Sequence, residues 1–252
     1  MLTSSDWYAQ HGKMPRLYVP VAFAPGAQVV LPEGPARHLT RVLRMGVGAT
    51  LVMFDGQGRE AGARLSEVNR KQTVVEIEAC WPGQAESPLA VHLGQAISKG
   101  DRMDYAIQKA VELGVAAITP LYTEHGDVRL KGEREAKKLA HWQAVAVSAC
   151  EQCGRATVPP VHPPLALADW LAKRDESLCL VLHPATQGAL EQAVSPEKVA
   201  LLIGPEGGLS SQEVEAALAA EFSSLTLGPR ILRTETAPVV ALSLLQDRFG
   251  DL

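Results

Sequence analysis

Apolar and polar residues follow two different patterns along this chain of 252 residues. In the first third, short alternating runs at residues 50–54 and 73–79 predict strands, and the intervening Asp-Gly-Gln-Gly at residues 55–58 predicts a turn. Further on, apolar strand-like segments alternate with longer helical patterns. These segments cover residues 89–96, 101–113, 116–120 and 133–151. Short strands separated by turns are typical of a small β-barrel, and strand–helix alternation is typical of a parallel α/β sheet.

The change of pattern predicts two domains. A stretch with Pro, Gly and Ser at residues 81–88 has the composition of a linker, which places a β-barrel at residues 14–85 and an α/β domain at 86–252. Residues 1–13 fit neither domain and are expected to form an extension that is open to disorder. The last helix, residues 238–249, is apolar on more than one side, so either the rest of the monomer or a second copy must cover it.

Two glycine-rich segments lie about one helix apart near the end of the chain. LLIGPEGGLS occupies residues 201–210 and LGPRILRTETAP occupies residues 227–238, and each is expected to be a buried strand that ends in a sharp turn. Between them, Ser210 and Glu213 form an S-x-x-E capping box that predicts a helix through Ala220. Loops that follow neighbouring parallel strands form a common docking place for a small ligand.

Composition and short motifs limit the classes of binding and catalysis that the chain can be expected to perform. The net charge of −4 argues against a general nucleic-acid binder, although basic residues outnumber acidic ones between residues 14 and 85. Four cysteines fit reduced thiols in a cytoplasmic protein. The Cys150–Cys153 pair ends a helical pattern, so we interpret both as structural thiols rather than as a redox pair. The absence of a P-loop argues against ATP or GTP hydrolysis, and the absence of G-x-G-x-x-G weakens the case for a dinucleotide site. Without H-x-x-x-H or a second C-x-x-C pair, no metal site is expected.

The glycine-rich segments are part of a wider resemblance. IGPEGG followed by LGPRILRTETA resembles the RsmE family of 16S ribosomal RNA uridine-N3 methyltransferases, within the SPOUT superfamily. RVLRMGVG at residues 41–48, IQKAVELGV at 107–115, ACEQCGR at 149–155 and LHP at 182–184 extend the match over nearly the whole chain from residue 14. The resemblance implies an N-terminal PUA-like RNA-binding barrel and a C-terminal SPOUT domain with a deep trefoil knot. It also implies a homodimer formed through that domain.

In the family the knotted crossing holds S-adenosylmethionine. The resemblance therefore implies cofactor contacts from the three loops at residues 182–184, 203–208 and 227–236. The expected cofactor-binding residues are Leu182, His183, Pro184, Ile203, Gly204, Pro205, Glu206, Gly207, Gly208, Leu227, Gly228, Ile231, Leu232 and Thr236. Backbone groups near Ile231 and Leu232 are expected to read the adenine edge. For Glu206 we favour capping of amides in its own turn over contact with the cofactor.

Uridine N3 is a weakly acidic imide, so methylation needs charge stabilisation or a base. Arg233 is the candidate for stabilising negative charge on the uracil carbonyls. Glu235 is the candidate for accepting the proton or for holding Arg233 in place. The alternative is that Arg233 and Glu235 form a purely structural ion pair.

Residues outside the cofactor loops must bind the RNA. Arg37, Arg41 and Arg44 have i, i+4, i+7 spacing, which predicts one helix face suited to phosphate contacts, with His38 beside them. A solvated surface helix without a partner is the alternative. Further candidates along the RNA path are Lys99, Arg102, Gln152 and Arg155.

The leading hypothesis is methyl transfer from S-adenosylmethionine to N3 of one uridine in the decoding region of 16S rRNA, on the assembled 30S subunit. One alternative is a related SPOUT enzyme that modifies a ribose 2′-hydroxyl or another base. A second alternative is a ribosome-assembly factor that binds RNA without catalysis.

Overall fold

The computed structural model describes residues 3–183 and 195–252. The chain divides into two compact units. The first comprises residues up to 86 together with 150–158, and the second comprises residues 87–149 and 159–252. Each unit has its own sheet and is described by itself. The functional domains at residues 14–85 and 86–252 stay a prediction.

The first unit is built on a mixed five-stranded sheet in the order β1-β3-β4-β5-β2. Its strands are β1 (Arg16–Tyr18), β2 (Gln28–Val30), β3 (Thr50–Phe54), β4 (Arg59–Val68) and β5 (Thr73–Pro82). Only β1 and β3 pair in parallel, and the other pairs are antiparallel. Alternate residues such as Leu51 and Met53 point into one apolar core, while Val52 belongs to a second cluster on the opposite face. The predicted strands at residues 50–54 and 73–79 are confirmed, and closure into a barrel stays a prediction.

The N-terminal extension forms a helix, which corrects the expectation of a segment open to disorder. Helix α1 (Ser4–His11) begins with a capping box in which Thr3 and Asp6 bond each other's backbone N–H groups. Trp7 is 1% exposed and packs on Gly62, where a Cβ atom would lie only 2.5 Å from the indole ring. An isolated helix of this length is marginal in water, so the docking of Trp7 stabilises it. A single buried residue gives no periodicity, and the sequence pattern therefore missed the helix.

The predicted linker at residues 81–88 also needs correction. Strand β5 continues to Pro82, and Trp81 is buried on the sheet, with its indole N–H donating to Glu60 at 2.6 Å. Trp81 and Trp7 lie with their ring centroids 6.1 Å apart. A Trp next to Pro and Gly has the composition of a linker, but its large apolar surface favours burial.

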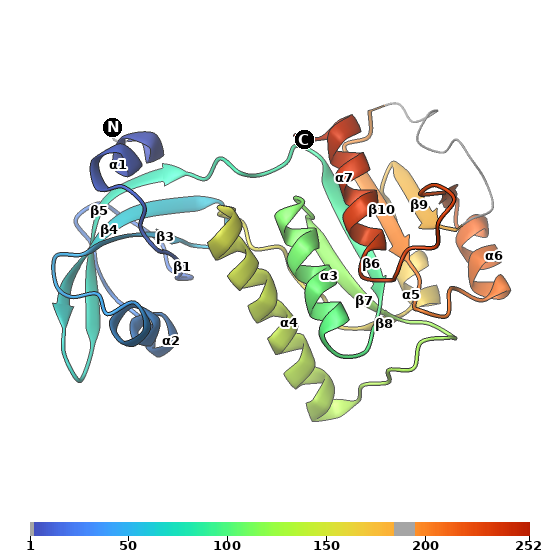
Figure 1. Cartoon of the computed structure of the whole chain (residues 1–252), viewed down its shortest axis with the longest axis horizontal. Coiled ribbons are helices and arrows are strands. Elements are labelled where there is room, and N and C mark those ends of the chain that lie inside the picture. Colours follow the sequence, from blue (N-terminus) through green and yellow to red (C-terminus); the bar gives the residue numbers. More distant parts are fainter. Residues whose placement is uncertain (1–2, 184–194) are drawn as a thin grey trace. The chain divides into compact units, whose positions relative to one another are not determined.

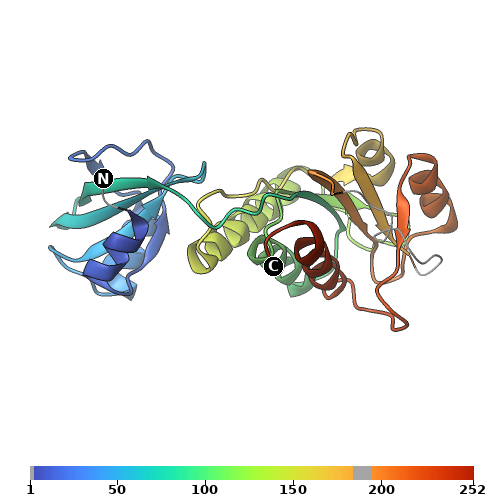
Figure 2. The same ribbon diagram turned by 90° about the horizontal axis from the view of Figure 1, so that it is seen from above.

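The second unit contains six parallel strands in the order β11-β9-β10-β6-β7-β8. They are β6 (Ala90–Ala96), β7 (Ala117–Tyr122), β8 (Leu165–Ala166), β9 (Leu178–Leu182), β10 (Lys198–Ile203) and β11 (Ser223–Leu225). The helices are α3 (Asp101–Glu112), α4 (Gly132–Cys153), α5 (Leu167–Leu171), α6 (Ser211–Ala219) and α7 (Ala237–Phe249). Helices α3 and α7 cover one face of the sheet, and α5 and α6 cover the other (Figures 1 and 2). The predicted parallel α/β architecture is confirmed.

Burial in this unit follows the sequence pattern closely. Strand β10 has neighbours on both sides, and residues 199–203 are all buried, as expected for a central strand covered by helices on both faces. The predicted core face of α3 is confirmed at Met103, Ala106, Ile107, Ala110 and Val111. The second glycine-rich segment needs correction: its strand, β11, ends at Leu225 and precedes the motif. The trefoil knot stays a prediction.

The Ser210–Glu213 capping box forms as predicted at the start of α6. Helix α7 buries Ala241, Leu242 and Leu245 within its own unit and leaves Leu244 42% exposed. Among the described residues, no helix combines the length and apolar character required to cross a bilayer.

Candidate active site

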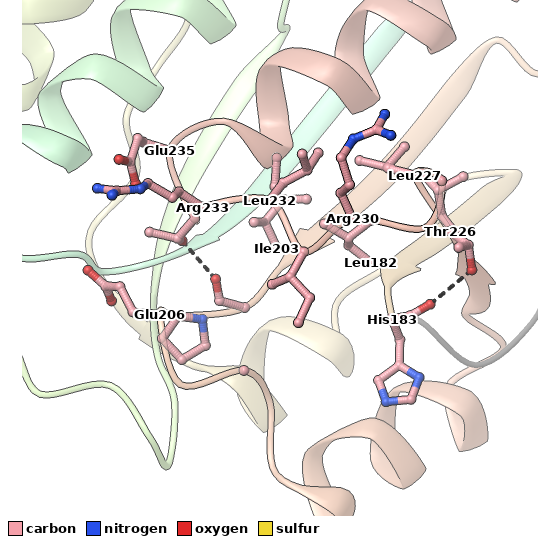
Figure 3. A pocket seen from close by; sticks show the side chains of 18 of the residues that line it. Leu182, His183, Ile203, Glu206, Thr226, Leu227, Arg230, Leu232, Arg233 and Glu235 are labelled. Atoms are coloured by element: carbon pink, nitrogen blue, oxygen red, sulfur yellow. Dashed lines mark hydrogen bonds between the residues drawn. The ribbon is translucent and has the colours of Figure 1, made fainter.

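A cavity of about 550 Å³ lies at the carboxyl ends of β9, β10 and β11. Three segments line most of it: the end of β9, the glycine loop after β10, and the irregular segment between β11 and α7. Ligands of parallel sheets dock at the carboxyl ends of strands, and cavities of this size hold small organic ligands. Figure 3 shows Leu182, Ile203 and Leu232 between the Glu206 end and the Thr226 end of the cavity.

Most of the residues predicted for the cofactor come together here. Those that line the cavity are Leu182, His183, Ile203, Gly204, Pro205, Glu206, Gly208, Leu227, Gly228, Ile231 and Leu232. Gly207 and Thr236 do not line it. Gly207 instead lies against His125, whose Cβ would be 3.2 Å from a Cβ at position 207, and Thr236 is the N-cap of α7. Pro184 lies outside the described residues. Binding of the cofactor by these residues stays a prediction.

The sequence reading missed part of the lining. Leu225, Thr226, Pro229, Arg230, Thr234 and Ala237 also face the cavity. Pro229, Arg230 and Thr234 lie inside the second glycine-rich motif, so treating that motif as one continuous wall would have found them. Arg102, which was predicted to contact RNA, lines the same cavity from the first turn of α3.

The segment between β11 and α7 offers open backbone donors. In the described part of the chain, the backbone N–H groups of Leu227, Gly228 and residues 230–232 donate no hydrogen bond, and Pro229 between them has no N–H. Gly228 has a φ of 77°, a left-handed conformation that suits glycine and turns the chain along the cavity. Ile231 is fully exposed. A cavity wall made of unpaired amides beside apolar side chains suits a heterocycle that both stacks and hydrogen-bonds.

Hydrogen bonds also hold the glycine loop after β10 against the segment that precedes α7. The hydroxyl of Thr234 donates to the carbonyl of Gly204 at 2.9 Å and accepts from the amide of Gln95 at 3.2 Å. Within the glycine loop, the Gly208 N–H donates to the Pro205 carbonyl at 2.9 Å. These bonds hold the two glycine-rich segments together at the end of the sheet.

The candidate catalytic residues Arg233 and Glu235 both line the cavity (Figure 3). No ion pair or hydrogen bond joins their side chains in the described part of the chain, which contradicts the alternative of a structural ion pair and the expectation that Glu235 holds Arg233. Arg233 is exposed, and one carboxylate oxygen of Glu235 is buried without a hydrogen-bond partner. The Arg233 guanidinium is therefore available to a substrate, and Glu235 lines the cavity with one carboxylate oxygen turned into the protein interior.

Glu206 behaves differently from the expectation. Its carboxylate accepts a hydrogen bond from the Arg102 guanidinium at 3.0 Å instead of capping amides of its own turn. The turn amide of Gly208 already bonds the backbone, so the long Glu206 side chain is free to reach α3.

Basic residues of the first unit line a separate groove of about 490 Å³. Arg37 and Arg41 lie in it, from helix α2 (Glu33–Arg37) and the π-helical turn η1 (His38–Val42). Arg70 and Lys71 join them from the turn between β4 and β5, and the sequence reading missed both. No ion pair neutralises these four cations within the described part of the chain.

The expected helix face does not reach Arg44. Arg44 has a φ of 54°, and the bond from the Met45 N–H to the Leu39 carbonyl at 2.9 Å closes the helix before it. The extra residue of the π-turn changes the 3.6-residue repeat, so i+7 spacing no longer predicts one face. His38 is exposed on η1.

The remaining RNA candidates differ in accessibility. Lys99 is exposed and pairs with Asp127 at 2.5 Å, and Gln152 is exposed near the end of α4. Arg155 is 5% exposed and pairs with Glu86 at 2.8 Å, so the structure contradicts its expected role at an RNA surface.

The cysteine pair shows no sign of an activated thiol. Burial raises the pKa of Cys150 to about 12, which strongly disfavours the thiolate near neutral pH. Cys150 is buried at the end of α4, its Sγ lies 3.6 Å from the Thr157 carbonyl, and both Cys150 and Cys153 are free thiols. These observations support the structural interpretation.

Two stretches of the chain match models of known protein families. The model of an RNA methyltransferase domain matches residues 85–246, and the model of an RNA methyltransferase PUA domain matches residues 31–78. The chain is similar to ribosomal RNA small subunit methyltransferase E of Buchnera aphidicola, with 36% identity over 95% of this chain and 98% of that one. The Bacillus subtilis protein of the same name is 36% identical over 82% of this chain and 84% of that one.

Solved structures agree with these relatives. Ribosomal RNA small subunit methyltransferase E of Neisseria gonorrhoeae, solved with S-adenosyl methionine, is 41% identical with a TM-score of 0.87. A protein of Legionella pneumophila, solved with bound SAM, is 44% identical with a TM-score of 0.92. In each case the match covers 95% of this chain and 100% of the other. The chain belongs to the ribosomal RNA small subunit methyltransferase E family.

Proposed function

We propose that this protein transfers the methyl group of S-adenosylmethionine to N3 of one uridine in the decoding region of 16S rRNA. The observation that carries the proposal is the cavity at the end of the parallel sheet, with open backbone donors on one wall and apolar side chains on the other. Its volume and lining fit an adenine-containing ligand. The proposal is supported by relatives named as ribosomal RNA methyltransferases and by one solved with S-adenosyl methionine.

The bound donor supplies an activated methyl group. Residues of this chain then have two tasks, which are to position the uracil and to manage one proton. Arg233 stabilises negative charge on the uracil carbonyls, since its guanidinium is exposed at the cavity and pairs with no carboxylate in the described part of the chain. Glu235 accepts the N3 proton, since its side chain lines the same cavity and its carboxylate has no ion-pair partner in the described part of the chain.

The first unit binds the RNA. Arg37, Arg41, Arg70 and Lys71 converge on one groove, and unpaired cations suit phosphate oxygens. Lys99 and Arg102 extend the contact surface of the second unit toward the cavity mouth. These contacts position the RNA without reading its sequence.

The proposal extends to the assembly and its setting. We infer a trefoil knot in the second unit, a PUA-like barrel in the first, and a homodimer in which a second copy covers the exposed part of α7 around Leu244. The substrate is the assembled 30S subunit, and free thiols fit the cytoplasm in which ribosomes are modified.

Methyl transfer from labelled S-adenosylmethionine tests the proposal. The acceptors are 30S subunits that lack the modification and free 16S rRNA, and the RNA is digested to nucleosides afterwards. We expect label in N3-methyluridine, with 30S as the better acceptor. Label in a ribose 2′-O-methyl nucleoside or in another base would support S-adenosylmethionine as the methyl donor and would show that N3 of uridine is not the methylated atom. RNA binding with no transfer to either acceptor would favour a non-catalytic assembly factor.

A further inference from the structure

Three buried polar groups connect segments that are far apart in the sequence. Gln95 lies near the end of β6, Gly204 follows β10, and Thr234 precedes α7. The Gln95 amide donates to the Thr234 hydroxyl at 3.2 Å, and the Thr234 hydroxyl donates to the Gly204 carbonyl at 2.9 Å. Gln95 is 1% exposed and Thr234 is 5% exposed. The chain of bonds therefore runs through the interior, directly behind the cavity wall.

The direction of these bonds is fixed by chemistry. A carbonyl oxygen can only accept, so the single proton of the Thr234 hydroxyl points at Gly204. The hydroxyl must then accept from its other neighbour, and only the NH₂ end of Gln95 can donate. The carbonyl oxygen of the Gln95 side chain is consequently the free end, and it is buried without a hydrogen-bond partner in the described part of the chain.

A purely structural role explains this arrangement poorly. A buried acceptor without a partner costs stability, whereas apolar residues of similar shape in place of both partners are often nearly neutral. A leucine at position 95 would fill a similar space without the unsatisfied side-chain oxygen, whereas a valine at position 234 would take the donor away from the Gly204 carbonyl. Buried polar groups that retain such a cost are commonly associated with a function.

We propose that Gln95 and Thr234 are positioning residues of the cofactor site. Their bonds fix the Gly204 peptide, and with it the turn from Pro205 to Gly208 that forms one cavity wall. The same bonds hold Thr234 between Arg233 and Glu235, so they set the place of both reactive side chains on the opposite wall. The inference rests on the proposed function, because the ligand whose site is positioned is S-adenosylmethionine.

Calorimetric titration with S-adenosyl-L-homocysteine tests the inference without relying on catalysis. We expect Thr234→Val and Gln95→Leu each to weaken binding about tenfold, the equivalent of one lost hydrogen bond. The double variant should bind no more weakly than either single one, since both changes break the same chain. Thr234→Ser keeps the hydroxyl and should restore the wild-type affinity. Urea unfolding midpoints of Gln95→Leu and the wild type should be close, because this change removes an unsatisfied oxygen and keeps the bond from Thr234 to Gly204.

Thr119→Val is the matched control. Thr119 is a buried threonine on β7 whose hydroxyl bonds His92 at 2.8 Å, away from the cavity, so its loss should leave the affinity unchanged. Equal affinities of wild type and Thr234→Val, or losses that add in the double variant, would overturn the inference while the proposed function stands. Failure of the wild type itself to bind the ligand would overturn the proposed function, and this inference with it.

Discussion

Arg102 in the first turn of α3 donates a hydrogen bond at 3.0 Å to Glu206 in the glycine loop, which links the two parts of the cavity rim. Both side chains are well exposed, at 46% and 39%, so water screens the pair. We expect Glu206→Gln to change the free energy of unfolding by less than about 1 kcal/mol, measured by urea denaturation. A loss larger than about 2 kcal/mol would show that the pair anchors the loop.

Arg233→Ala should lower the rate of methyl transfer far more than it weakens cofactor binding. The guanidinium is exposed at the cavity without an ion pair among the described residues, so its removal leaves no buried carboxylate uncompensated. We expect kcat to fall about 100-fold or more, as for the loss of one charge-stabilising donor. Arg134→Ala, an exposed arginine on α4, is the control and should keep the wild-type rate. Equal rates for Arg233→Ala and the wild type would remove Arg233 from the mechanism.

Charge reversal at Arg41 and Arg70 should weaken RNA binding and flatten its dependence on salt. Both side chains line the groove of the first unit, and each phosphate contact contributes to the salt slope. Binding of 16S rRNA fragments measured at two or more salt concentrations gives both quantities. The control is Lys131→Glu with Arg134→Glu, which changes the net charge equally at exposed positions elsewhere. A control that loses as much affinity would show that net charge, and not the groove, governs binding.

Trp7→Ala should destabilise the first unit by about 3–5 kcal/mol, because a fully buried indole leaves a large cavity. Gly62→Ala should destabilise it too, since the added methyl group would displace the indole. Gln10→Ala, at an exposed position of the same helix, should have little effect. Urea unfolding followed by tryptophan fluorescence measures all three. An unchanged unfolding curve for Trp7→Ala would show that α1 is not docked in solution.

The stability of the second unit should fall as the pH drops below about 6.5. Burial, together with the neighbouring Arg174 and His162, lowers the pKa of His92 from 6.5 to about 3. The Arg174 guanidinium lies 2.7 Å from His92 Nδ1, so that nitrogen accepts and the folded state keeps the ring neutral. Between these two pKa values the unfolded chain binds one more proton than the folded chain.

For this one group, the loss between pH 6.5 and 5 amounts to about 2 kcal/mol, and no loss occurs above pH 7. Urea unfolding at pH 7 and pH 5 should therefore show a smaller pH effect in His92→Gln than in the wild type. Identical pH effects in the two proteins would contradict the lowered pKa.

Strong periodicity made the second unit predictable. The core face of α3 and the capping box of α6 each depend on contacts within one helix, and both appear in the structure as the sequence indicated. Helix α1 and Trp81 were missed because their positions depend on packing against β4, which lies elsewhere in the sequence. The π-turn before Arg44 was missed for a related reason, since it changes the period on which the reading of that helix relied.

In the candidate site, too, the sequence indicated some features and missed others. Glycine-rich motifs indicated the loops, because close backbone approach and left-handed turns restrict the residue types there. The partners of individual side chains were not readable from the motifs. Glu206 bonds Arg102 across 104 positions, and Thr234 bonds Gln95 across 139, so only the folded sheet brings these pairs together.

The position of the cavity in the chain has a consequence for protein synthesis. The segment from Leu225 to Ala237 forms much of its lining, whereas the basic groove is complete by Thr73. A ribosome therefore finishes the groove long before the last wall of the cavity has been translated. A chain that ends after residue 158 would contain all of the first unit, including the residues of the groove, and would lack the cavity. On the proposed function, such a fragment would bind RNA and transfer no methyl group.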